Sequence, residues 1–321
     1  MEKKVFYALA CVLCLTGCSS QSAIEEVILP EVKQSPIQFS VQMEKETLSF
    51  PVTRSMPENT IGEPSAFSKA TEGDAELNEL CSTLEYVVFK EEESEVTLVK
   101  HRQYVYNAAS LDVDFGIVYD TLPAGNYTFY FFAHNSKSAT LSGTTFSFDS
   151  ITDSFFEVLP LEIQVAETIN ENITLNRIVS RIEFMATDPV TEELKQFDME
   201  IENLSNQFDL ANGYGLLATE KQTFSYQFQE SEIGETEHIH AFYTFVSDTD
   251  TPMTARLAAI SQNDEEIRVR QIKEIVPEAN KIIRYKGRLY SRSEADNTFQ
   301  ISIYNNGEWE ETAEIVLPEY E

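Results

Sequence analysis

Leu122-Pro123-Ala124-Gly125-Asn126 leads directly into Tyr127-Thr128-Phe129-Tyr130-Phe131-Phe132-Ala133, and this stretch sets the architecture expected of the whole chain. Pro and Gly stand where tight turns favour them, because Pro presets its backbone angle and Gly tolerates conformations closed to other residues. The run that follows is almost entirely aromatic, a composition typical of a strand buried on both faces. The stretch therefore predicts a turn that enters the central strand of a β-sandwich.

Strand patterns continue on both sides of this stretch. Residues 38–43 alternate polar and apolar side chains, the period of a half-buried strand. Residues 84–89 and 96–99 flank a charged turn and predict a hairpin. Residues 173–184 form one long strand-like run. Further strands are expected at 48–52, 113–119, 145–148, 155–159, 161–165, 197–202, 223–229, 238–246, 253–260, 267–275, 281–290, 299–304 and 311–317.

Helix signals are confined to a short turn that Asp74 could cap, so the chain is expected to be all-β, with two tandem β-sandwich domains. The expected divisions are a signal peptide at 1–17, a flexible spacer at 18–35, an N-terminal β-sandwich at 36–175 and a C-terminal β-sandwich at 176–321. The boundary between the two sandwiches falls near Asn176, inside the long run.

The N-terminus has the pattern of an export signal that ends in a lipidated cysteine. Lys3 and Lys4 precede an apolar run that is too short to span a bilayer, and Leu15-Thr16-Gly17-Cys18 follows it. This motif resembles the lipobox of bacterial lipoproteins, in which the cysteine is acylated and becomes the first mature residue. The resemblance implies lipidation of Cys18 and attachment to the outer membrane; the alternative is an ordinary signal peptide with a cysteine by chance.

Composition limits the classes of partner. The chain has 54 acidic and 23 basic residues, a formal net charge of −31, so it is expected to repel nucleic acid and anionic membrane surfaces. Membrane attachment would then depend on lipid rather than charge. Loss of the signal peptide and acylation of Cys18 would leave Cys81 as the one free cysteine, which excludes an internal disulfide and predicts a small buried hydrophobic side chain.

The sequence carries no recognisable catalytic motif. The sequence has no Gly-rich phosphate loop, no G-x-S-x-G and no H-E-x-x-H, so no catalytic residue, cofactor or enzymatic activity is predicted. His238 and His240 alternate with Ile239 and Ala241, which would place both imidazoles on one exposed face of a strand with the apolar residues inward. No third ligand accompanies the pair, so no metal site is predicted.

Basic residues are concentrated near the C-terminus, where eight of the 23 fall between Arg268 and Arg292. On two strands, the charged side chains are expected to face outward and alternate with inward apolar residues such as Val269 and Ile283. One interpretation is local pairing with acidic neighbours, which contributes little per pair. The other is a docking patch for an acidic partner, formed by Arg268, Arg270, Arg284, Lys286 and Arg288.

The chain resembles the fimbrillin superfamily of type V pilus proteins. The resemblance rests on the lipobox, on the turn from Leu122 into the aromatic strand, on Leu175-Asn176-Arg177-Ile178-Val179-Ser180-Arg181-Ile182, and on the end of the chain with Asn306-Gly307-Glu308-Trp309. The ending is most similar to the FimB-type anchor and accessory subunits. The resemblance implies transthyretin-like sandwiches, assembly with other fimbrial subunits by strand donation, and a structural role in adhesion at the cell surface.

Two questions stay open at the level of sequence. In stalk subunits of this superfamily a protease cuts after an Arg near the N-terminus, and Arg54 is suitably placed for such a cut, which would discard Cys18. The strand at 38–43 and the short tail after residue 317 favour a retained anchor instead. The alternative function, from a different class, is a surface lipoprotein that binds a glycan or another ligand for a nutrient-uptake system.

Overall fold

The computed structural model describes residues 33–44, 47, 50, 76–92, 95–110, 114–291, 298–305 and 308–316. Nearly all of their regular structure is β-strand, and the strands of these residues form four sheets, so the predicted all-β sandwich class is confirmed. The described residues contain one short α-helix, α1 (Leu77–Leu80), and two 3-10 turns, Ala108–Ser110 and Glu230–Glu232. None of the described helices has the length and apolar character needed to cross a membrane.

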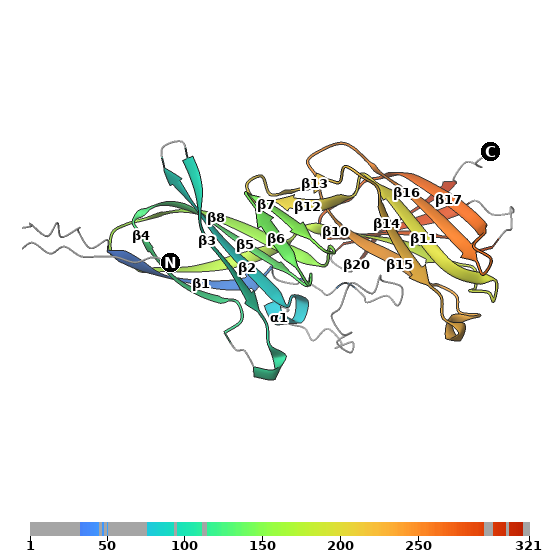
Figure 1. Cartoon of the computed structure of the whole chain (residues 1–321), viewed down its shortest axis with the longest axis horizontal. Coiled ribbons are helices and arrows are strands. Elements are labelled where there is room, and N and C mark those ends of the chain that lie inside the picture. The colour runs from blue at the N-terminus through green and yellow to red at the C-terminus, as the bar shows by residue number, and fades with distance from the viewer. Residues whose placement is uncertain are drawn as a thin grey trace, which may run out of the picture. The chain divides into compact units, whose positions relative to one another are not determined.

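The largest sheet has seven strands in the order β3-β2-β5-β8-β9-β1-β4 (Figure 1). Its strands are β1 (Gln34–Met43), β2 (Thr83–Glu92), β3 (Glu95–Val105), β4 (Ile117–Pro123), β5 (Gly125–His134), β8 (Ser154–Ile163) and β9 (Ile169–Arg177). The sheet curls on itself, because the Phe39 ring on β1 lies 5.0 Å from both the Phe129 and the Phe131 ring on β5, two strands that do not pair.

Three smaller sheets hold the remaining strands. One has the order β15-β10-β18-β19-β20, another β14-β11-β16-β17, and a third β13-β12-β7-β6. Their bounds are β6 (Ala139–Ser142), β7 (Thr145–Phe148), β10 (Val179–Ala186), β11 (Leu194–Glu202), β12 (Ser205–Asp209), β13 (Tyr214–Leu217), β14 (Gln222–Gln227), β15 (Ile239–Phe245), β16 (Met253–Ser261), β17 (Glu266–Ile275), β18 (Lys281–Gly287), β19 (Thr298–Asn305) and β20 (Glu308–Val316).

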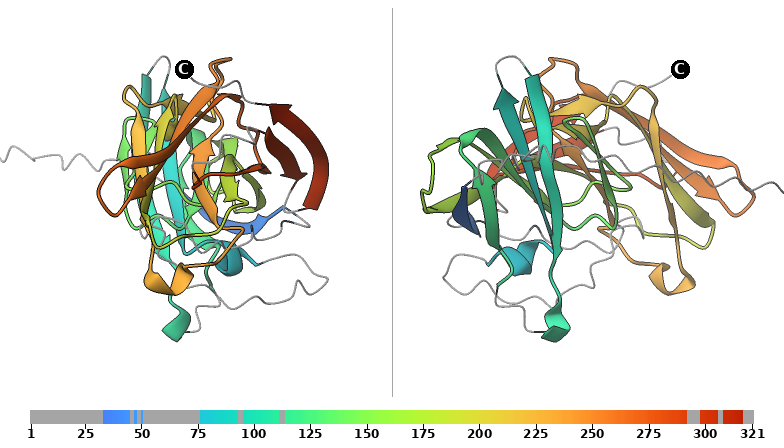
Figure 2. Two further views of the ribbon diagram at one scale, coloured as in Figure 1. Left: turned by 90° about the vertical axis from the view of Figure 1, so that its right-hand side faces the viewer. Right: turned by 60° about the vertical axis from the view of Figure 1, so that its left-hand side comes forward.

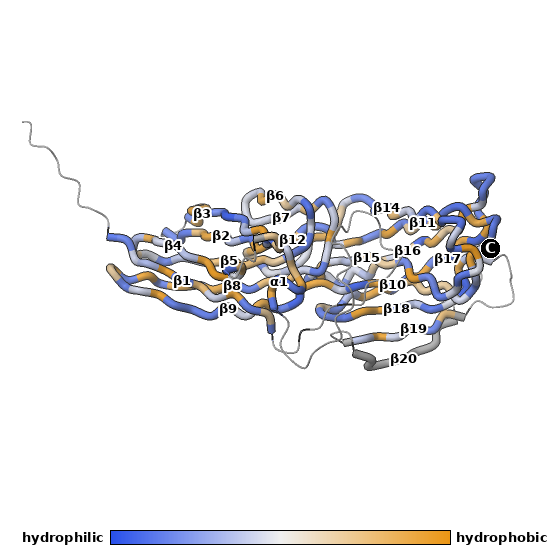
Figure 3. Tube along the Cα trace, turned by 90° about the horizontal axis from the view of Figure 1, so that it is seen from below, coloured by the Kyte–Doolittle hydropathy of each residue, from blue (hydrophilic) through white to orange (hydrophobic). Residues whose placement is uncertain are grey.

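Buried apolar side chains form three clusters. The first lies within the curled seven-stranded sheet, and the second combines side chains of the β15-β10-β18-β19-β20 and β14-β11-β16-β17 sheets. The third brings together Phe132 of β5, Phe146 of β7, Phe208 of β12 and Phe245 of β15. Hydrophobic and hydrophilic residues alternate along strands such as β1 and β9 (Figure 3), as expected where one face meets a core.

Several predicted elements differ in extent from the observed ones. The run 173–184 is two strands, since β9 ends at Arg177 and β10 begins at Val179 in another sheet. The strands expected at 155–159 and 161–165 are one strand, β8, which continues through Pro160. Pro160 is tolerated because β8 pairs with β9 only at Phe155 and Phe156, leaving that edge of β8 without a pairing strand among the described residues.

The remaining differences are small or concern short strands. The strand expected at 113–119 is β4, which begins at Ile117, and the turn expected after Asp74 is α1, whose capping box is formed by Glu76 and Glu79. The short strands β6, β12 and β13 were not predicted. The buried position predicted for Cys81 is confirmed, with 2% of the residue exposed. The division into two tandem domains stays a prediction.

Candidate functional site

The N-terminal strand β1 is an inner strand of the seven-stranded sheet. It pairs antiparallel with β4 from Gln34 opposite Pro123 to Ser40 opposite Ile117. On its other edge it pairs parallel with β9 from Ile37 opposite Ile169 onward. Both edges of β1 therefore bond to the same chain, and its removal would separate β4 from β9.

The side chains of β1 fill the first core. Ile37, Phe39, Val41 and Met43 are at most 7% exposed, with Phe39 fully buried. Burying four such side chains contributes roughly 6–12 kcal/mol by transfer arithmetic, which is an upper estimate for folding. Phe39 also packs against the Tyr86 ring at 6.1 Å, so its core contacts come from both β2 and β5. A chain without β1 would expose an apolar slot of this composition.

Local contacts close the slot around β1. The Val41 amide donates to the Gly116 carbonyl oxygen over 2.8 Å, at the turn that enters β4. Gly116 has a φ of +96°, and a Cβ atom there would lie 2.9 Å from the Val41 carbonyl oxygen. Two constraints therefore require glycine at this position: its positive φ angle and the close approach of β1. At the start of β1, the Ser35 hydroxyl donates to the Gln164 carbonyl oxygen over 2.8 Å.

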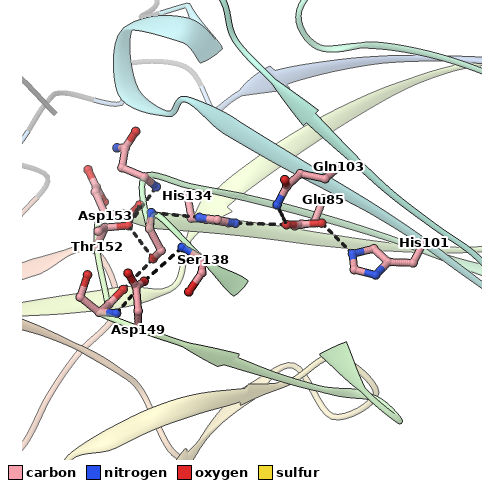
Figure 4. Close-up of polar contacts among 11 residues, drawn as sticks. Glu85, His101, Gln103, His134, Ser138, Asp149, Thr152 and Asp153 are labelled. Atoms are coloured by element: carbon pink, nitrogen blue, oxygen red, sulfur yellow. Dashed lines mark hydrogen bonds and ion pairs between the residues drawn. The ribbon is translucent and has the colours of Figure 1, made fainter. Parts of the chain in front are cut away.

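A buried carboxylate lies on the other face of β2, where its partners His101 and His134 contact the Phe146 and Phe132 rings of the third cluster. Glu85 is fully buried and accepts hydrogen bonds from His101 over 2.7 Å and from Gln103 over 2.6 Å, both on the neighbouring strand β3 (Figure 4). His134 of β5, also fully buried, lies 3.5 Å from Glu85 on the other side. The Ser136 amide donates to His134 Nδ1 over 3.0 Å, so Nδ1 is the acceptor and Nε2 carries the ring proton that faces Glu85.

This carboxylate is stabilised in its ionised form. Burial raises the pKa of Glu85, but the hydrogen bonds from His134, Gln103 and His101 outweigh it, and the pKa is lowered overall. The group could carry protons between imidazoles, yet it has no nucleophilic side chain as a hydrogen-bond partner among the described residues. We interpret it as a structural cluster that ties β3 to β2 and β5.

The second candidate cluster contains the two alternating histidines. The expectation of an exposed pair is wrong, because His238 and His240 are 5% and 0% exposed. β15 is covered on both faces, since Ala241, on the opposite face, is fully buried too. His240 shares a hydrogen bond of 2.6 Å with the Tyr290 hydroxyl and stacks on the Phe197 ring at 4.1 Å. Burial, with a smaller contribution from His238, holds the pKa of His240 well below its usual value.

These histidines therefore belong to an aromatic core. The described residues contain no group of three His, Cys, Asp or Glu side chains arranged to hold a metal ion.

The predicted basic patch is divided between two sheets. On β17, Arg268 Nη1 donates to the Ser291 carbonyl oxygen over 2.5 Å, and the Arg270 guanidinium lies 5.6 Å from the Phe299 ring centroid. Both side chains are half-buried, whereas Val269 between them is 40% exposed. The expectation that Val269 points inward is therefore wrong.

On β18, Ile283 and Tyr285 are buried as predicted, but the face of Arg284 is not fully outward, because Ile282 on the same face is 1% exposed. Arg284 Nε donates to Glu183 over 2.6 Å, and Lys286 pairs with Glu237 over 3.1 Å. Arg288, just after β18, is half-buried. These contacts agree with local pairing for Arg284 and Lys286, and docking by the five basic residues stays a prediction.

Comparison with known proteins identifies the family. The family model for fimbrillin-A associated anchor proteins Mfa1 and Mfa2 matches residues 66–320. The chain belongs to this family. The resemblance inferred from sequence is thereby confirmed, and the family is one of structural fimbrial proteins. The comparison with curated protein sequences gave no match.

Solved structures with similar folds include three bacterial proteins. A candidate polysaccharide-binding protein from Bacteroides thetaiotaomicron has 12% identity and a TM-score of 0.50, over 86% of this chain and 97% of that one. A candidate adhesin from Bacteroides ovatus has 13% identity and a TM-score of 0.48, over 81% and 88%. The fimbrial anchor protein Mfa2 from Porphyromonas gingivalis has 12% identity and a TM-score of 0.46, over 86% and 98%. At such identities, similarity concerns the fold alone.

Two of the predicted site residues, Cys18 and Arg54, lie outside the described residues of this Mfa1/Mfa2-family chain. Lipidation and processing therefore stay predictions.

Sequence reasoning also missed polar residues that the structure buries. Arg177, at the end of β9, forms a bidentate pair with Asp153 over 2.7 and 2.9 Å, and its guanidinium lies 3.9 Å from the Phe50 ring centroid. Arg177 belongs to the motif 175–182 on which the family resemblance rests, but nothing in that motif indicated that its side chain is buried.

Proposed function

We propose that this chain is an anchor or accessory subunit of a surface pilus, held at the outer membrane by lipid on Cys18. Membership of the anchor family supports the structural role and association with other fimbrial subunits. The observation that carries the anchor role is the position of β1, paired on both edges and filling the first core. A subunit that is not cut at Arg54 keeps β1 and, with it, the covalent link to a lipidated Cys18.

Processing at Arg54 would instead separate Cys18 and its lipid from the rest of the subunit. Cleavage there would cut the covalent link between β1 and the rest of the chain, and loss of β1 would open a slot between β4 and β9. Such a slot is a template for the strand of another subunit, since it offers unpaired backbone on both sides and apolar side chains below. We therefore propose that Arg54 stays uncut and that β1 occupies the slot that strand donation would fill in a stalk subunit.

We also propose two tandem domains, with the boundary near residue 176. The first core draws on residues 37–175 and the second on residues 182–299, which supports this division. The third cluster and the pairing of β7 with β12 join the two parts, so they are expected to unfold together.

Genetic deletion and two substitutions test the proposal. Loss of this chain, or Cys18→Ala, should release intact pili into the medium and alter their length, whereas Arg54→Ala should leave assembly unchanged. Palmitate labelling of the wild-type protein and its loss in Cys18→Ala would establish the lipid. Mature protein that starts at Ser55 and is repeated along the shaft would make this chain a stalk subunit. Normal pili after deletion, together with retention on polysaccharide gels, would favour the ligand-binding alternative.

A further inference from the structure

Strands β4, β1 and β9 form a sheet face that is turned away from the first core and carries no charge at any outward position of these fully described strands. In register, Tyr119 of β4, Gln38 of β1 and Asn170 of β9 form one row across the three strands. Alternate residues along each strand continue this uncharged face. Most of its side chains are amides and hydroxyls, including Gln38, Ser40, Gln42, Asn170, Asn172 and Thr174.

The uncharged face is an outer surface of the molecule. β1, in dark blue, lies beside β4 and β9 at one side (Figure 2, right), and the three strands also run side by side in Figure 3. Tyr119 is 62% exposed. Glu171 is exposed too, but it stands opposite inward-facing Phe39 in the register and so belongs to the other side of β9. The nearest charges in sequence on β1, those of Lys33 and Glu44, lie just beyond its two ends.

Another outer sheet face of the same chain is charged. On the β14-β11-β16-β17 sheet, Glu200 of β11 stands opposite Arg256 of β16, and Asp198 lies on the same face of β11. Lys221 Nζ donates to Glu200 over 2.6 Å. Exposure to water therefore does not explain why the face of β4, β1 and β9 lacks charge.

The residue types on β9 also depart from what a strand favours. Asn is depleted in strands, yet Asn170, Asn172 and Asn176 all point outward from this one strand of nine residues. Positions that contradict local propensity are expected where function selects the side chain. The face is also ordered at both edges, since Asn176 Nδ2 donates to Glu157 over 3.0 Å and Arg102 Nη1 donates to the Tyr119 carbonyl oxygen over 3.2 Å.

We propose that the uncharged face binds a neutral glycan, with the Tyr119 ring against a sugar ring and the amides of Gln38 and Asn170 bonded to its hydroxyls. A sugar hydroxyl both donates and accepts hydrogen bonds, and a side-chain amide offers both a donor and an acceptor. The exposed tyrosine supplies a flat apolar surface with a polar end. Rows of side chains on neighbouring strands, about 4.8 Å apart, offer such contacts to successive sugars.

Other classes of ligand fit this face less well. The net charge of −31 repels an acidic polysaccharide, whereas a basic ligand would favour faces that carry carboxylates. A protein partner normally requires a centre of several large apolar or arginine side chains. Tyr119 is the one aromatic residue among the outward positions of these three strands, and no arginine accompanies it there.

This inference goes beyond the proposed anchor role and does not depend on it. The glycan would contact outward side chains of β1 while the inward ones stay in the first core. An anchored subunit could therefore bind a glycan without strand exchange.

Affinity electrophoresis of the full-length protein in detergent tests the ligand class. The native gels contain mannan, dextran, laminarin or galactan as neutral probes, and alginate as the acidic probe. We expect at least one neutral probe to retard the protein and alginate not to do so. Tyr119→Ala should weaken the binding by about tenfold or more, which corresponds to about 1.4 kcal/mol. Tyr119→Phe, which keeps the ring, should retain most of it.

A double substitution tests the location. Gln38→Ala with Asn170→Ala should also weaken retardation by about tenfold or more. The matched control is Asn206→Ala with Gln222→Ala, which removes the same two amide types from a polar hollow of about 220 Å³ elsewhere on the chain. The control should bind like the wild type. Melting temperatures of all variants should stay close to the wild-type value, since surface substitutions change stability little.

Several results would overturn the proposal. These are no retardation by any neutral probe, equal retardation by alginate, retardation that Tyr119→Ala leaves unchanged, and loss in the Asn206 and Gln222 control instead. A dimer in sedimentation that Tyr119→Ala disperses, without glycan binding, would assign the face to a second copy of this chain.

The outcomes are independent of the anchor test. If deletion of the chain releases pili but no neutral probe retards the protein, the anchor function stands and the glycan proposal is wrong. If deletion leaves pili normal while retardation depends on Tyr119, the glycan site stands and the anchor function fails.

Discussion

Replacing Arg284 by methionine removes a cation that neutralises a buried carboxylate. Glu183 on β10 is fully buried, and Arg284 Nε on the neighbouring strand β18 donates to it over 2.6 Å. Arg181, 1% exposed, lies 3.0 Å from the other oxygen of the same carboxylate. Methionine keeps much of the apolar length of arginine, so the substitution mainly deletes the charge and its hydrogen bonds.

The expected loss follows from the burial of these groups. Removing one partner of a buried ion pair typically costs about 3–5 kcal/mol, because the remaining charge is left without compensation. Here Arg181 still compensates Glu183, and the Arg284 side chain is 19% exposed, so water can enter. Hydrogen bonds to charged groups contribute about 1.5–3 kcal/mol each. We therefore expect Arg284→Met to lower the free energy of unfolding by about 2–3 kcal/mol.

Lys286→Met is the matched control for urea unfolding at neutral pH. It alters net charge equally, lies two residues further along β18, and removes a pair with Glu237, whose side chain is 60% exposed. Such surface pairs contribute about 0–1 kcal/mol. If the two variants lost the same stability within about 0.5 kcal/mol, the stabilising role assigned to Arg284 would be refuted. Charge reversal at Lys286 or Arg288 is therefore a cleaner test of docking than reversal at Arg284.

Three further predictions concern other buried side chains. Phe39→Ala should lower the free energy of unfolding by about 3–5 kcal/mol in urea titrations, with exposed Gln42→Ala as the near-neutral control; equal losses would contradict the slot described for β1. Burial raises the pKa of the Cys81 thiol, so a thiol reagent should label it at the rate of unfolding, and fast labelling of the native protein would contradict this. Because the pKa of Glu85 is lowered in the folded state, its ionised carboxylate stabilises the fold above the ordinary carboxyl pKa, and this contribution is lost as the pH falls through the folded-state pKa. The difference in free energy of unfolding between the wild type and Glu85→Gln should therefore shrink between about pH 5 and pH 3. A difference that stayed constant over this range would contradict the assigned role of Glu85.

Much of the fold was predictable because its strands carry strong local patterns. The aromatic run after Gly125 predicted a strand covered on both faces, and in the structure Phe129 and Phe131 enter the first core while Tyr130 and Phe132 enter the third. The sheet that covers the second face was not predictable in the same way. Its strands β12 and β13 have five and four residues, and β12 pairs Phe208 with Phe146 of β7. Such distant partners leave no periodic signal in a short segment.

The candidate site was less predictable, because alternation tells which residues share a face but not what covers it. His238 and His240 do share a face, as predicted, but that face packs against aromatic rings such as Phe197 rather than water. Glu85 and Glu183 sit in strands whose apolar character predicted burial, yet their compensating partners come from neighbouring strands. A carboxylate in a buried strand requires a partner, and only the sheet register identifies it.

Internal pairing removes similar numbers of positive and negative charges from the surface, so the exterior keeps the strongly acidic balance of the whole chain. Arg177 and Arg181 are buried beside acidic groups, and Lys100 and Arg284 each pair with a buried carboxylate, so these cations neutralise charge inside the fold. Many of the 54 acidic residues remain for the exterior, and subunits with such surfaces repel each other at long range. Salt then has two opposing effects on assembly. Screening weakens this general repulsion and also weakens any local attraction between opposite charges at a contact between subunits. A net weakening of pilus attachment with salt would mean that local attraction dominates, whereas a net strengthening would mean that backbone pairing and apolar contact hold the subunits against their charge.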